Sequence, residues 1–241
     1  MLPEISFEFL DPHKGGDVDA VARLHETYLG GSPVVKLGAR FLRAFYYRLL
    51  IEDGLIGCMF CRVGGRIVGF VSFTVFPDDF IARGVRRHFV FLGWLLLRGI
   101  LVRPGLLKNV LEAVRLSLRR PGEAKAHAGP GCAEALSMAT ERAYRKLAPE
   151  GESRLPYRLL EEVFQHIRGQ GMSNVVFLVR CDNRASNIFC RSFTHEVERA
   201  VFDGEPVNRY TYRLDGPIRL GRRRPTGREL PAHANPAGAS R

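Results

Sequence analysis

The chain contains 241 residues, of which 46% are hydrophobic and 25% are charged. These fractions are typical of a folded globular protein and exclude a disordered or fibrous chain. The length allows one domain with a substantial core. The net charge is +11, of which the last 26 residues account for +5, and the remaining +6 suits acidic ligands such as phosphates.

The first half of the sequence predicts a strand, two helices and a β-hairpin. Alternation at 5–9 indicates a short strand, and a 3.6-residue apolar period predicts helices at 17–28 and 37–49. Two β-rich runs follow, 58–63 and 66–75, with a pair of glycines between them. Because both turn positions of a tight hairpin accept glycine at positive φ, this spacing predicts a hairpin.

Five cysteines are scattered through a sequence without a secretion signal. This usage predicts free thiols in a reducing compartment, and hence a cytoplasmic protein. Cys58 and Cys61 form a CxxC pair, but residues three apart on a strand point to opposite faces and cannot easily bind one metal ion. Since no second pair lies at zinc spacing, we predict no metal site.

Between 77 and 131 the sequence predicts an inserted helical pair, at about 81–120. The first helix carries the apolar run 88–102, which Arg98 interrupts and which is shorter than the roughly 20 residues of a membrane-spanning helix. The second has a helical apolar register at 106–118. We favour a helical pair packed on the core. The alternative is a helix on a membrane surface, which would place the protein on a lipid-linked acceptor.

The second half of the sequence alternates strands and helices. A strand at 135–139 precedes an amphipathic helix at 157–168, a strand at 174–180 and a helix that begins near Asn183. A closing antiparallel pair extends from 197 to 214. A helix N-terminus offers unpaired N–H groups and a positive dipole end, so the loop before the first of these helices suits a phosphate.

The last 26 residues, Gly216 to Arg241, contain six Arg and one Glu and are rich in Pro, Gly and Ala. This composition predicts a disordered basic tail after a domain at 1–215. The arginines could contact nucleic acid only as nonspecific charge, so we predict no specific nucleic-acid partner.

This order of elements resembles the GNAT superfamily of N-acyltransferases. The residues that carry the similarity span most of 5–214 and are Leu37-Gly38 with Phe41-Leu42 and Tyr46, the run 67–71, the run 134–139, Leu159-Leu160, and Asn183 with Ala185, Asn187 and Phe189. The resemblance implies an α+β fold with a mixed, mostly antiparallel central sheet. Its middle strands would splay apart, helices would flank it, and the helical pair would be an insertion.

The resemblance implies that acetyl-CoA or another acyl-CoA, as co-substrate, lies between the splayed strands, with its pyrophosphate on the amides before Tyr157. The implied cofactor-binding residues are Met138, Ala139, Arg145, Ser153, Arg154, Leu155, Arg158, Asn183 and Asn187. The sequence departs from the family pattern at Arg154 and Pro156, where small residues let the backbone approach the phosphates. Charge from Arg154 and Arg158 would replace that approach.

The same resemblance implies a general base for the substrate amine and a general acid for the departing thiolate. Glu134 is the candidate base by its position. Cys190 stands where the family has a Tyr and is the candidate acid, and a buried small residue is the other interpretation of this cysteine. Backbone N–H groups near Ser137 to Ala139 would stabilise the oxyanion. Ser137 itself would be structural or would touch the substrate.

The sequence therefore predicts an N-acyltransferase that moves an acetyl or other acyl group from acyl-CoA to a small-molecule amine, with an amino sugar or sugar nucleotide favoured. The alternative is a catalytically silent GNAT-like module that binds or regulates, motivated by Arg154, Pro156 and Cys190. The acceptor, the acyl chain length and the oligomeric state stay open.

Overall fold

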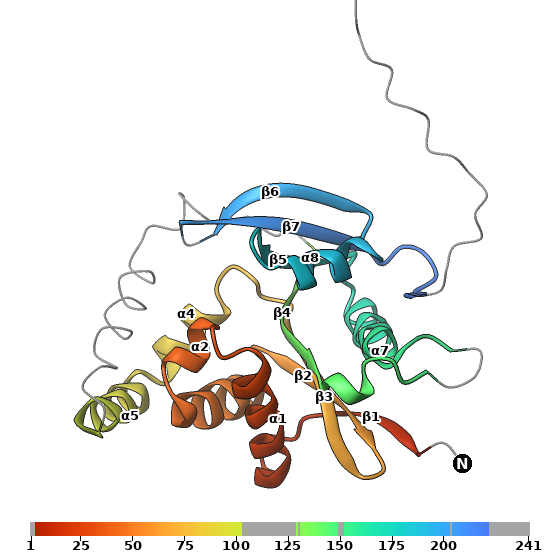
Figure 1. Ribbon diagram of the computed structural model, residues 1–241. Coiled ribbons are helices and arrows are strands. Elements are labelled where there is room, and N and C mark those ends of the chain that lie inside the picture. The colour runs from red at the N-terminus through yellow and green to blue at the C-terminus, as the bar shows by residue number, and fades with distance from the viewer. Residues whose placement is uncertain (1–2, 103–128, 130, 149–151, 203, 222–241) are drawn as a thin grey trace, which may run out of the picture.

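A computed structural model describes residues 3–102, 129, 131–148, 152–202 and 204–221, and its centre is a seven-stranded sheet (Figure 1). The strand order is β1-β2-β3-β4-β5-β7-β6, and all neighbours are antiparallel except β4 and β5. The strands are β1 (Ile5–Phe9), β2 (Gly57–Val63), β3 (Arg66–Thr74), β4 (Cys132–Thr140), β5 (Asn174–Arg180), β6 (Glu196–Phe202) and β7 (Glu205–Arg213). This mixed, mostly antiparallel sheet with flanking helices confirms the predicted α+β class.

Helices cover both faces of the sheet. The first half of the chain contributes α1 (Gly15–Tyr28), α2 (Pro33–Lys36), η1 (Phe41–Leu49), α3 (Leu50–Glu52), α4 (Phe80–Arg87) and α5 (Phe89–Val102). The second half contributes the short 3₁₀ turn η2 (Arg142–Tyr144), α7 (Leu155–Gly169) and α8 (Arg184–Arg191). Of the predicted inserted pair, α4 and α5 account for the first helix, and the predicted helix at 106–118 lies outside the described residues.

Each face of the sheet has its own core. One, here called the α7-side core, includes Leu159 and Phe164 of α7 and Cys61 of β2. The other, the η1-side core, includes Phe45 of η1 and Cys58 of β2. Cys58 and Cys61 therefore face opposite sides of the sheet, as the strand alternation predicts.

The helix that the sequence predicts at 37–49 contains a π-helix, η1. Its wider turn leaves two consecutive tyrosines, Tyr46 and Tyr47, both buried in the η1-side core. Segments of π-helix are frequent at functional sites because they displace side chains from the ordinary helical positions. Here both tyrosines are directed at the middle of the sheet.

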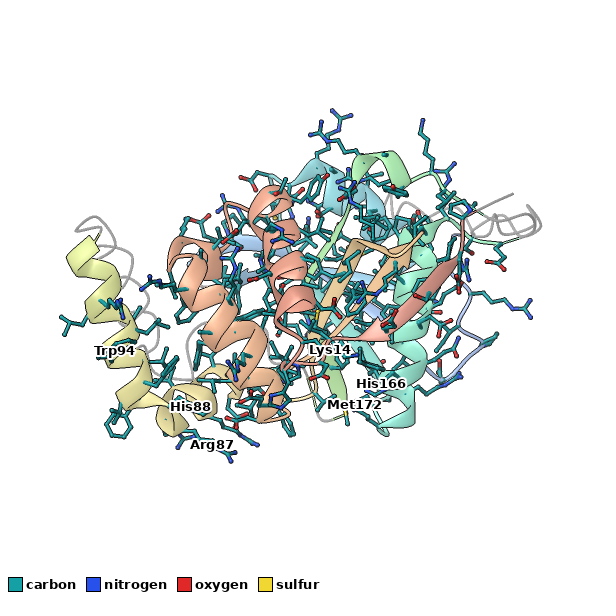
Figure 2. All side chains as sticks on the ribbon, turned by 90° about the horizontal axis from the view of Figure 1, so that it is seen from below. Lys14, Arg87, His88, Trp94, His166 and Met172 are labelled. Atoms are coloured by element: carbon teal, nitrogen blue, oxygen red, sulfur yellow. The ribbon has the colours of Figure 1, made fainter. Side chains whose placement is uncertain are left out.

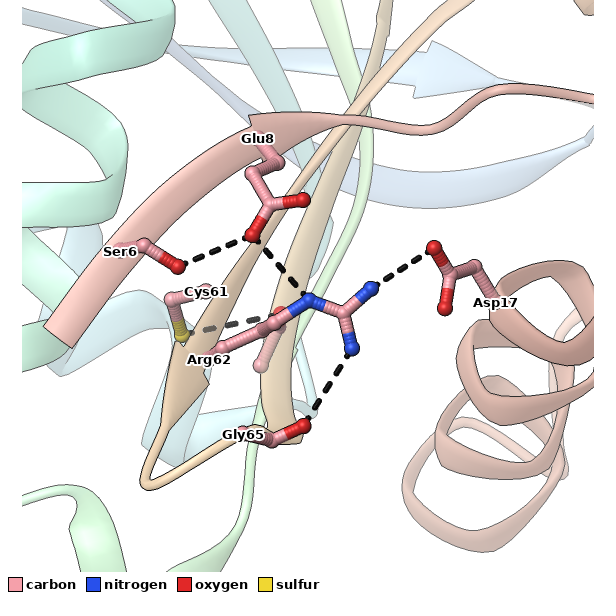
Figure 3. Close-up of polar contacts among 7 residues, drawn as sticks. Ser6, Glu8, Asp17, Cys61, Arg62 and Gly65 are labelled. Atoms are coloured by element: carbon pink, nitrogen blue, oxygen red, sulfur yellow. Dashed lines mark hydrogen bonds and ion pairs between the residues drawn. The ribbon is translucent and has the colours of Figure 1, made fainter. Parts of the chain in front are cut away.

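Arg62 of β2 joins the N-terminal strand to the first helix (Figure 3). Its Nε donates to Glu8 of β1 at 3.1 Å, and its Nη2 donates to Asp17 of α1 at 2.7 Å. A third donation, from Nη1, reaches the Gly65 carbonyl in the hairpin turn at 3.4 Å. The bonds to Asp17 and Glu8 raise the pKa of Arg62, so the guanidinium in this connection stays charged.

The C-terminal segment packs on α7 further along the chain than the sequence predicts. The predicted disordered tail begins at Gly216, yet Leu220 is buried in the α7-side core. The Leu220 amide donates to Glu161 of α7, and the Gly216 carbonyl accepts a hydrogen bond from Arg168 at 3.2 Å. Ile218 and Leu220, the apolar residues of 216–221, are too few to set a periodicity, so this packing leaves no pattern in the sequence. Residues 222–241 lie outside the described part of the chain.

Within the described residues, no helix is both long and apolar enough to cross a membrane.

Candidate functional site

The two central parallel strands separate after a short ladder. β4 and β5 pair only through Cys132 with Asn174, Ala133 with Val175, and Glu134 with Val176. Beyond these three pairs β4 continues to Thr140 while β5 continues to Arg180, and Figure 1 shows β4 running away from the part of the sheet formed by β5, β7 and β6. This region is here called the fork. The splayed middle strands of the prediction are confirmed.

The fork leaves the middle of β4 accessible. A strand with neighbours on both sides, like β3, is buried from Ile67 to Thr74, whereas residues 134–138 of β4 are only partly buried. Beyond Glu134, the backbone of β4 on the β5 side has no partner in the β4–β5 ladder. An unpaired strand edge inside a protein needs another hydrogen-bonding partner, so this edge of β4 is suited to a ligand that carries amide groups.

A β-bulge lies in β4 at the fork. Ser72 of β3 pairs with Ser137, and the next residue, Phe73, pairs with Ala135, so Leu136 is the extra residue. Bulges redirect side chains and are over-represented next to active sites. Because Ala135 packs on the α7-side core, its neighbour Glu134 points to the opposite face, toward η1. The bulge brings Ser137 to that face as well.

Glu134 and Ser137 meet hydroxyl groups from η1 and β3 there. The Tyr46 hydroxyl lies 3.5 Å from the Ser72 hydroxyl. Burial raises the pKa of Tyr46, hydrogen bonds with Ser72 and Ser137 oppose this shift, and the nearby Glu134 adds to it. Tyr46, Ser72, Ser137 and Glu134 therefore form one polar group, here called the fork cluster, inside an otherwise apolar layer.

A neutral histidine supports the fork cluster from behind. His25 of α1 is fully buried, with its Nδ1 2.7 Å from the Tyr47 hydroxyl and its Nε2 3.1 Å from the Ser32 hydroxyl. Burial lowers the pKa of His25 to about 4, so the ring is uncharged at neutral pH. One ring nitrogen then donates and the other accepts. This arrangement fixes Tyr47 and, through the adjacent backbone, Tyr46.

The start of α7, predicted to hold the pyrophosphate, uses its backbone amides within the protein. The Leu155 amide donates to the Leu147 carbonyl at 2.8 Å, and the amides of Tyr157 and Arg158 donate to the Arg154 carbonyl. Pro156, in the first turn, is buried and has no N–H. The amides of Leu155, Tyr157 and Arg158 are therefore already bonded within the protein, and the pyrophosphate site before Tyr157 stays a prediction. Residues 149–151 of the same loop lie outside the described part of the chain.

The side chains of the same loop are divided between internal and exposed positions. The Ser153 hydroxyl is buried and donates to the Leu220 carbonyl, so it is turned toward the C-terminal segment. Arg154 is exposed. Arg158 pairs with Glu152 at 2.7 Å and lies over the Phe7 ring. Arg154 and Arg158 are the cations at this end of the loop, and their role toward a phosphate stays a prediction.

The predicted cofactor residues of β4 lie on both faces of the strand. Met138 packs against the α7-side core and is partly exposed, while Ala139 is buried in the η1-side core. Arg145, after β4, donates to the Thr140 carbonyl at 2.9 Å and lies over the Tyr28 ring of α1. Arg145 thus anchors the end of β4 to the first helix, and its role toward a cofactor stays a prediction.

Asn183 and Asn187 have structural partners in α8. The Asn183 side chain accepts from the Ser186 amide and caps the helix. Asn187 is buried, and its amide group donates to the carbonyls of Arg180 and Asn183 at 2.9 and 2.7 Å. Its oxygen accepts from Asn208 and from the Tyr210 hydroxyl of β7. These bonds hold the end of β5, α8 and β7 together, which leaves the Asn187 side chain little capacity for a cofactor.

Cys190 faces the interior rather than an open surface. Its side chain is buried in the α7-side core, and burial raises the pKa of the thiol to about 12. A buried thiol with this pKa is a poor proton donor at neutral pH. The geometry thus favours the small buried residue, the alternative that the sequence leaves open.

Sequence reasoning missed Ser72, Tyr47 and His25 as members or supports of the site. The available signals were weak: Ser72 is a lone hydroxyl in an apolar strand, and His25 lies on the apolar side of its helix. No group of three His, Cys, Asp or Glu residues that could hold a metal ion occurs in the part of the chain that the structure describes.

No family model matches this sequence, and no curated protein matches it either. Several solved structures are similar to this chain. AAC(6')-Ib in complex with ribostamycin and coenzyme A is 8% identical, with a TM-score of 0.52 over 87% of this chain and 93% of that chain. PaiA N-acetyltransferase from Thermoplasma acidophilum, in complex with coenzyme A, is 10% identical, with a TM-score of 0.48 over 87% and 99%. An N-acetyltransferase from Staphylococcus aureus Mu50 is 10% identical, with a TM-score of 0.49 over 88% and 99%.

The protein has the fold of the GNAT acetyltransferases. This likeness, at such low identity, is one of fold.

Proposed function

We propose that the protein is an acyl-CoA-dependent N-acyltransferase acting on the amine of a small molecule. The observation that carries this proposal is the fork, where the β4–β5 ladder ends after three pairs and leaves the edge of β4 beyond Glu134 without a β5 partner and only partly buried. A pantetheine arm is extended and carries two amide groups, so it can pair with such an edge as a strand would. The fold likeness to AAC(6')-Ib, solved with coenzyme A, supports the same co-substrate.

In the proposed reaction the amine nitrogen attacks the thioester carbonyl carbon. The amine proton passes to Glu134, directly or through water, and backbone N–H groups of β4 near Ser137 to Ala139 stabilise the oxyanion. The carbon–sulfur bond then breaks, giving the amide and the CoA thiolate, which takes up a proton. Cys190 is buried, so we do not assign the protonation of the CoA thiolate to it or to any other described side chain.

The fork cluster is the proposed acceptor side of the site. Ser137, which is only partly buried, can hydrogen-bond a polar acceptor beside Glu134, while the buried Tyr46 holds Ser137 from behind. A hydroxyl at this place suits an acceptor that itself carries hydroxyls. An amino sugar or sugar nucleotide is therefore the favoured acceptor class.

A silent GNAT-like binding module is the second candidate. The observation that favours it is the start of α7, where the Leu155, Tyr157 and Arg158 amides are bonded inside the protein and Pro156 has no N–H.

A thiol-release assay with acetyl-CoA and a panel of amines, amino sugars and sugar nucleotides, run beside calorimetry, separates the candidates. Binding with amine-dependent thiol release supports the transferase. Binding without turnover on any amine supports the silent module. No binding at millimolar acetyl-CoA contradicts both the transferase and any module that binds this ligand.

A further inference from the structure

The helix α5 has two apolar faces, and among the described residues only one of them is covered. Leu92 and Leu95 are buried in the η1-side core. The other face carries Val90, Trp94 and Leu97, which are 69%, 56% and 58% exposed. Spacings of four and three residues place these three on one side of the helix. Phe89 and Phe91, also exposed, extend the apolar surface at the start of the helix.

This surface lies at the edge of the part of the chain that the structure describes. Figure 1 shows α5 farther from the sheet than α1, and Figure 2 shows Trp94 on the outer part of the same helix. Exposed large apolar side chains that occur singly are ordinary, but a contiguous apolar face marks an interaction site. We call Phe89, Val90, Phe91, Trp94 and Leu97 the α5 apolar face.

The charged residues on α4 and α5 themselves are all basic. From Phe80 to Val102 the sequence contains four Arg and no Lys, Asp or Glu. Arg83 and Arg87 pair with acidic groups outside this stretch, Asp79 at 2.7 Å and Asp53 at 3.3 Å. The Arg98 guanidinium lies 5.3 Å from the centre of the Trp94 ring. An arginine beside an exposed tryptophan combines an apolar body with a cationic end, which suits the boundary between lipid and water.

We propose that the α5 apolar face docks on the surface of an anionic lipid bilayer. The helix has 14 residues and is about 21 Å long, short of the roughly 30 Å hydrocarbon core. It therefore lies along the interface with its exposed side chains among the acyl chains and its arginines at the headgroups. A lipid surface accounts both for the exposed α5 apolar face and for the basic side chains of α4 and α5. A second copy of this positively charged chain would meet repulsion.

The sequence offers an internal reporter for the test, because Trp94 is the single tryptophan. The full chain is mixed with vesicles of phosphatidylcholine containing phosphatidylglycerol, and separately with vesicles of phosphatidylcholine alone. We expect sedimentation with the anionic vesicles, less at high salt, with Trp94 emission shifted to shorter wavelength and quenched by lipids brominated on their acyl chains. No sedimentation at low salt, equal binding to neutral vesicles, or unquenched Trp94 fluorescence in bound protein would each overturn the proposal.

A matched pair of variants locates the contact. Leu97→Asp places a charge on the α5 apolar face, and Ile188→Asp places one on α8 at a position that is 61% exposed, close to the 58% of Leu97. We expect Leu97→Asp to lower vesicle affinity by at least ~tenfold and Ile188→Asp to leave it unchanged. If a folded Leu97→Asp variant binds anionic vesicles as tightly as the unmodified chain, basic residues outside the α5 apolar face cause the binding. A dimer that Leu97→Asp dissociates, in protein that ignores vesicles, would make a second copy the occupant. Both results contradict the proposal, and the quenching of Trp94 in the unmodified chain decides it if the variant does not fold.

Discussion

Glu134 of β4 and Val176 of β5 form the last residue pair before the two strands separate. This places a carboxylate at the base of the fork, on the face that carries Tyr46 and Ser137. The base of the fork is where a thioester at the end of an inserted pantetheine arm would come to lie. The pair thus connects the opening in the sheet to the group that would take the amine proton.

The role of Glu134 as general base predicts a large loss of turnover in Glu134→Gln. The amide keeps the shape but accepts no proton, so we expect kcat with acetyl-CoA and an accepted amine to fall about 10²- to 10⁴-fold. Glu141→Gln is the matched control, because Glu141 follows the same strand but pairs with Arg66 at 2.7 Å. Equal activity in Glu134→Gln and Glu141→Gln would remove Glu134 from the mechanism.

Asn187 is predicted to contribute to stability rather than to cofactor affinity. Asn187→Ala removes its bonds to two backbone carbonyls and leaves Asn208 and the Tyr210 hydroxyl without their acceptor. Each buried group left without a partner costs about 1–3 kcal/mol, so we expect a loss of about 3 kcal/mol or more in the free energy of unfolding.

Asn183→Ala, which removes only the α8 cap, is the control for Asn187→Ala and should cost about 1 kcal/mol. Chemical denaturation measures both. If Asn187→Ala keeps full stability and weakens acetyl-CoA binding instead, the original cofactor prediction for Asn187 is right and this account of it is wrong.

The buried His25 predicts a loss of stability in mild acid. Its pKa is about 4 in the folded protein and 6.5 in a solvated chain, so the unfolded state binds the proton at higher pH. The free energy of unfolding therefore falls as the pH drops from about 6.5 to about 4, by about 3 kcal/mol in all from this group. Denaturation midpoints across this range should show the decline.

The variant His25→Gln tests whether His25 causes that decline. Glutamine can still donate and accept near Tyr47 and Ser32 but does not titrate. We expect the variant to be less stable at pH 7 and to depend less on pH between 6.5 and 4. An unchanged slope would show that other groups cause the acid sensitivity.

The packing of the C-terminal segment predicts a cost for Leu220→Ala. Leu220 is buried in the α7-side core beside α7, so its truncation should lower the free energy of unfolding by about 2–4 kcal/mol. Ile188→Ala, at an exposed position, should stay within about 0.5 kcal/mol of the unmodified protein. If Leu220→Ala and Ile188→Ala have similarly small effects on stability, Leu220 does not contribute to the core, and the tail begins at Gly216 as the sequence predicts.

The fold was largely predictable because the apolar periods are strong. The hairpin turn at Gly64 and Gly65 adopts φ angles of 56° and 80°, as the glycine pair predicts. The strand and helix order then allowed the resemblance to the GNAT fold. The packing of 216–221 was not predictable, because the burial of Leu220 depends on a surface of α7 that is remote in sequence.

The candidate site was less predictable than the fold. Glu134 and Ser137 stand in a motif-like strand start, so sequence could single them out. The partners of Ser137 on η1 and β3, Tyr46 and Ser72, depend on a π-helix and on a bulge at Leu136, and neither has a sequence signature here. Cys190 stands where the GNAT pattern has a Tyr, which made it a candidate acid. Its burial depends on how α8 packs on the sheet, and the sequence does not show that packing.

Hydrogen–deuterium exchange of the full chain, with and without acetyl-CoA, tests the fork most directly. The edge of β4 beyond Glu134 has no β5 partner in the free protein, and a bound pantetheine arm would pair with it. The account predicts slower exchange in peptides covering residues 135–140 when acetyl-CoA is present. Unchanged exchange in 135–140 at saturating acetyl-CoA would contradict it.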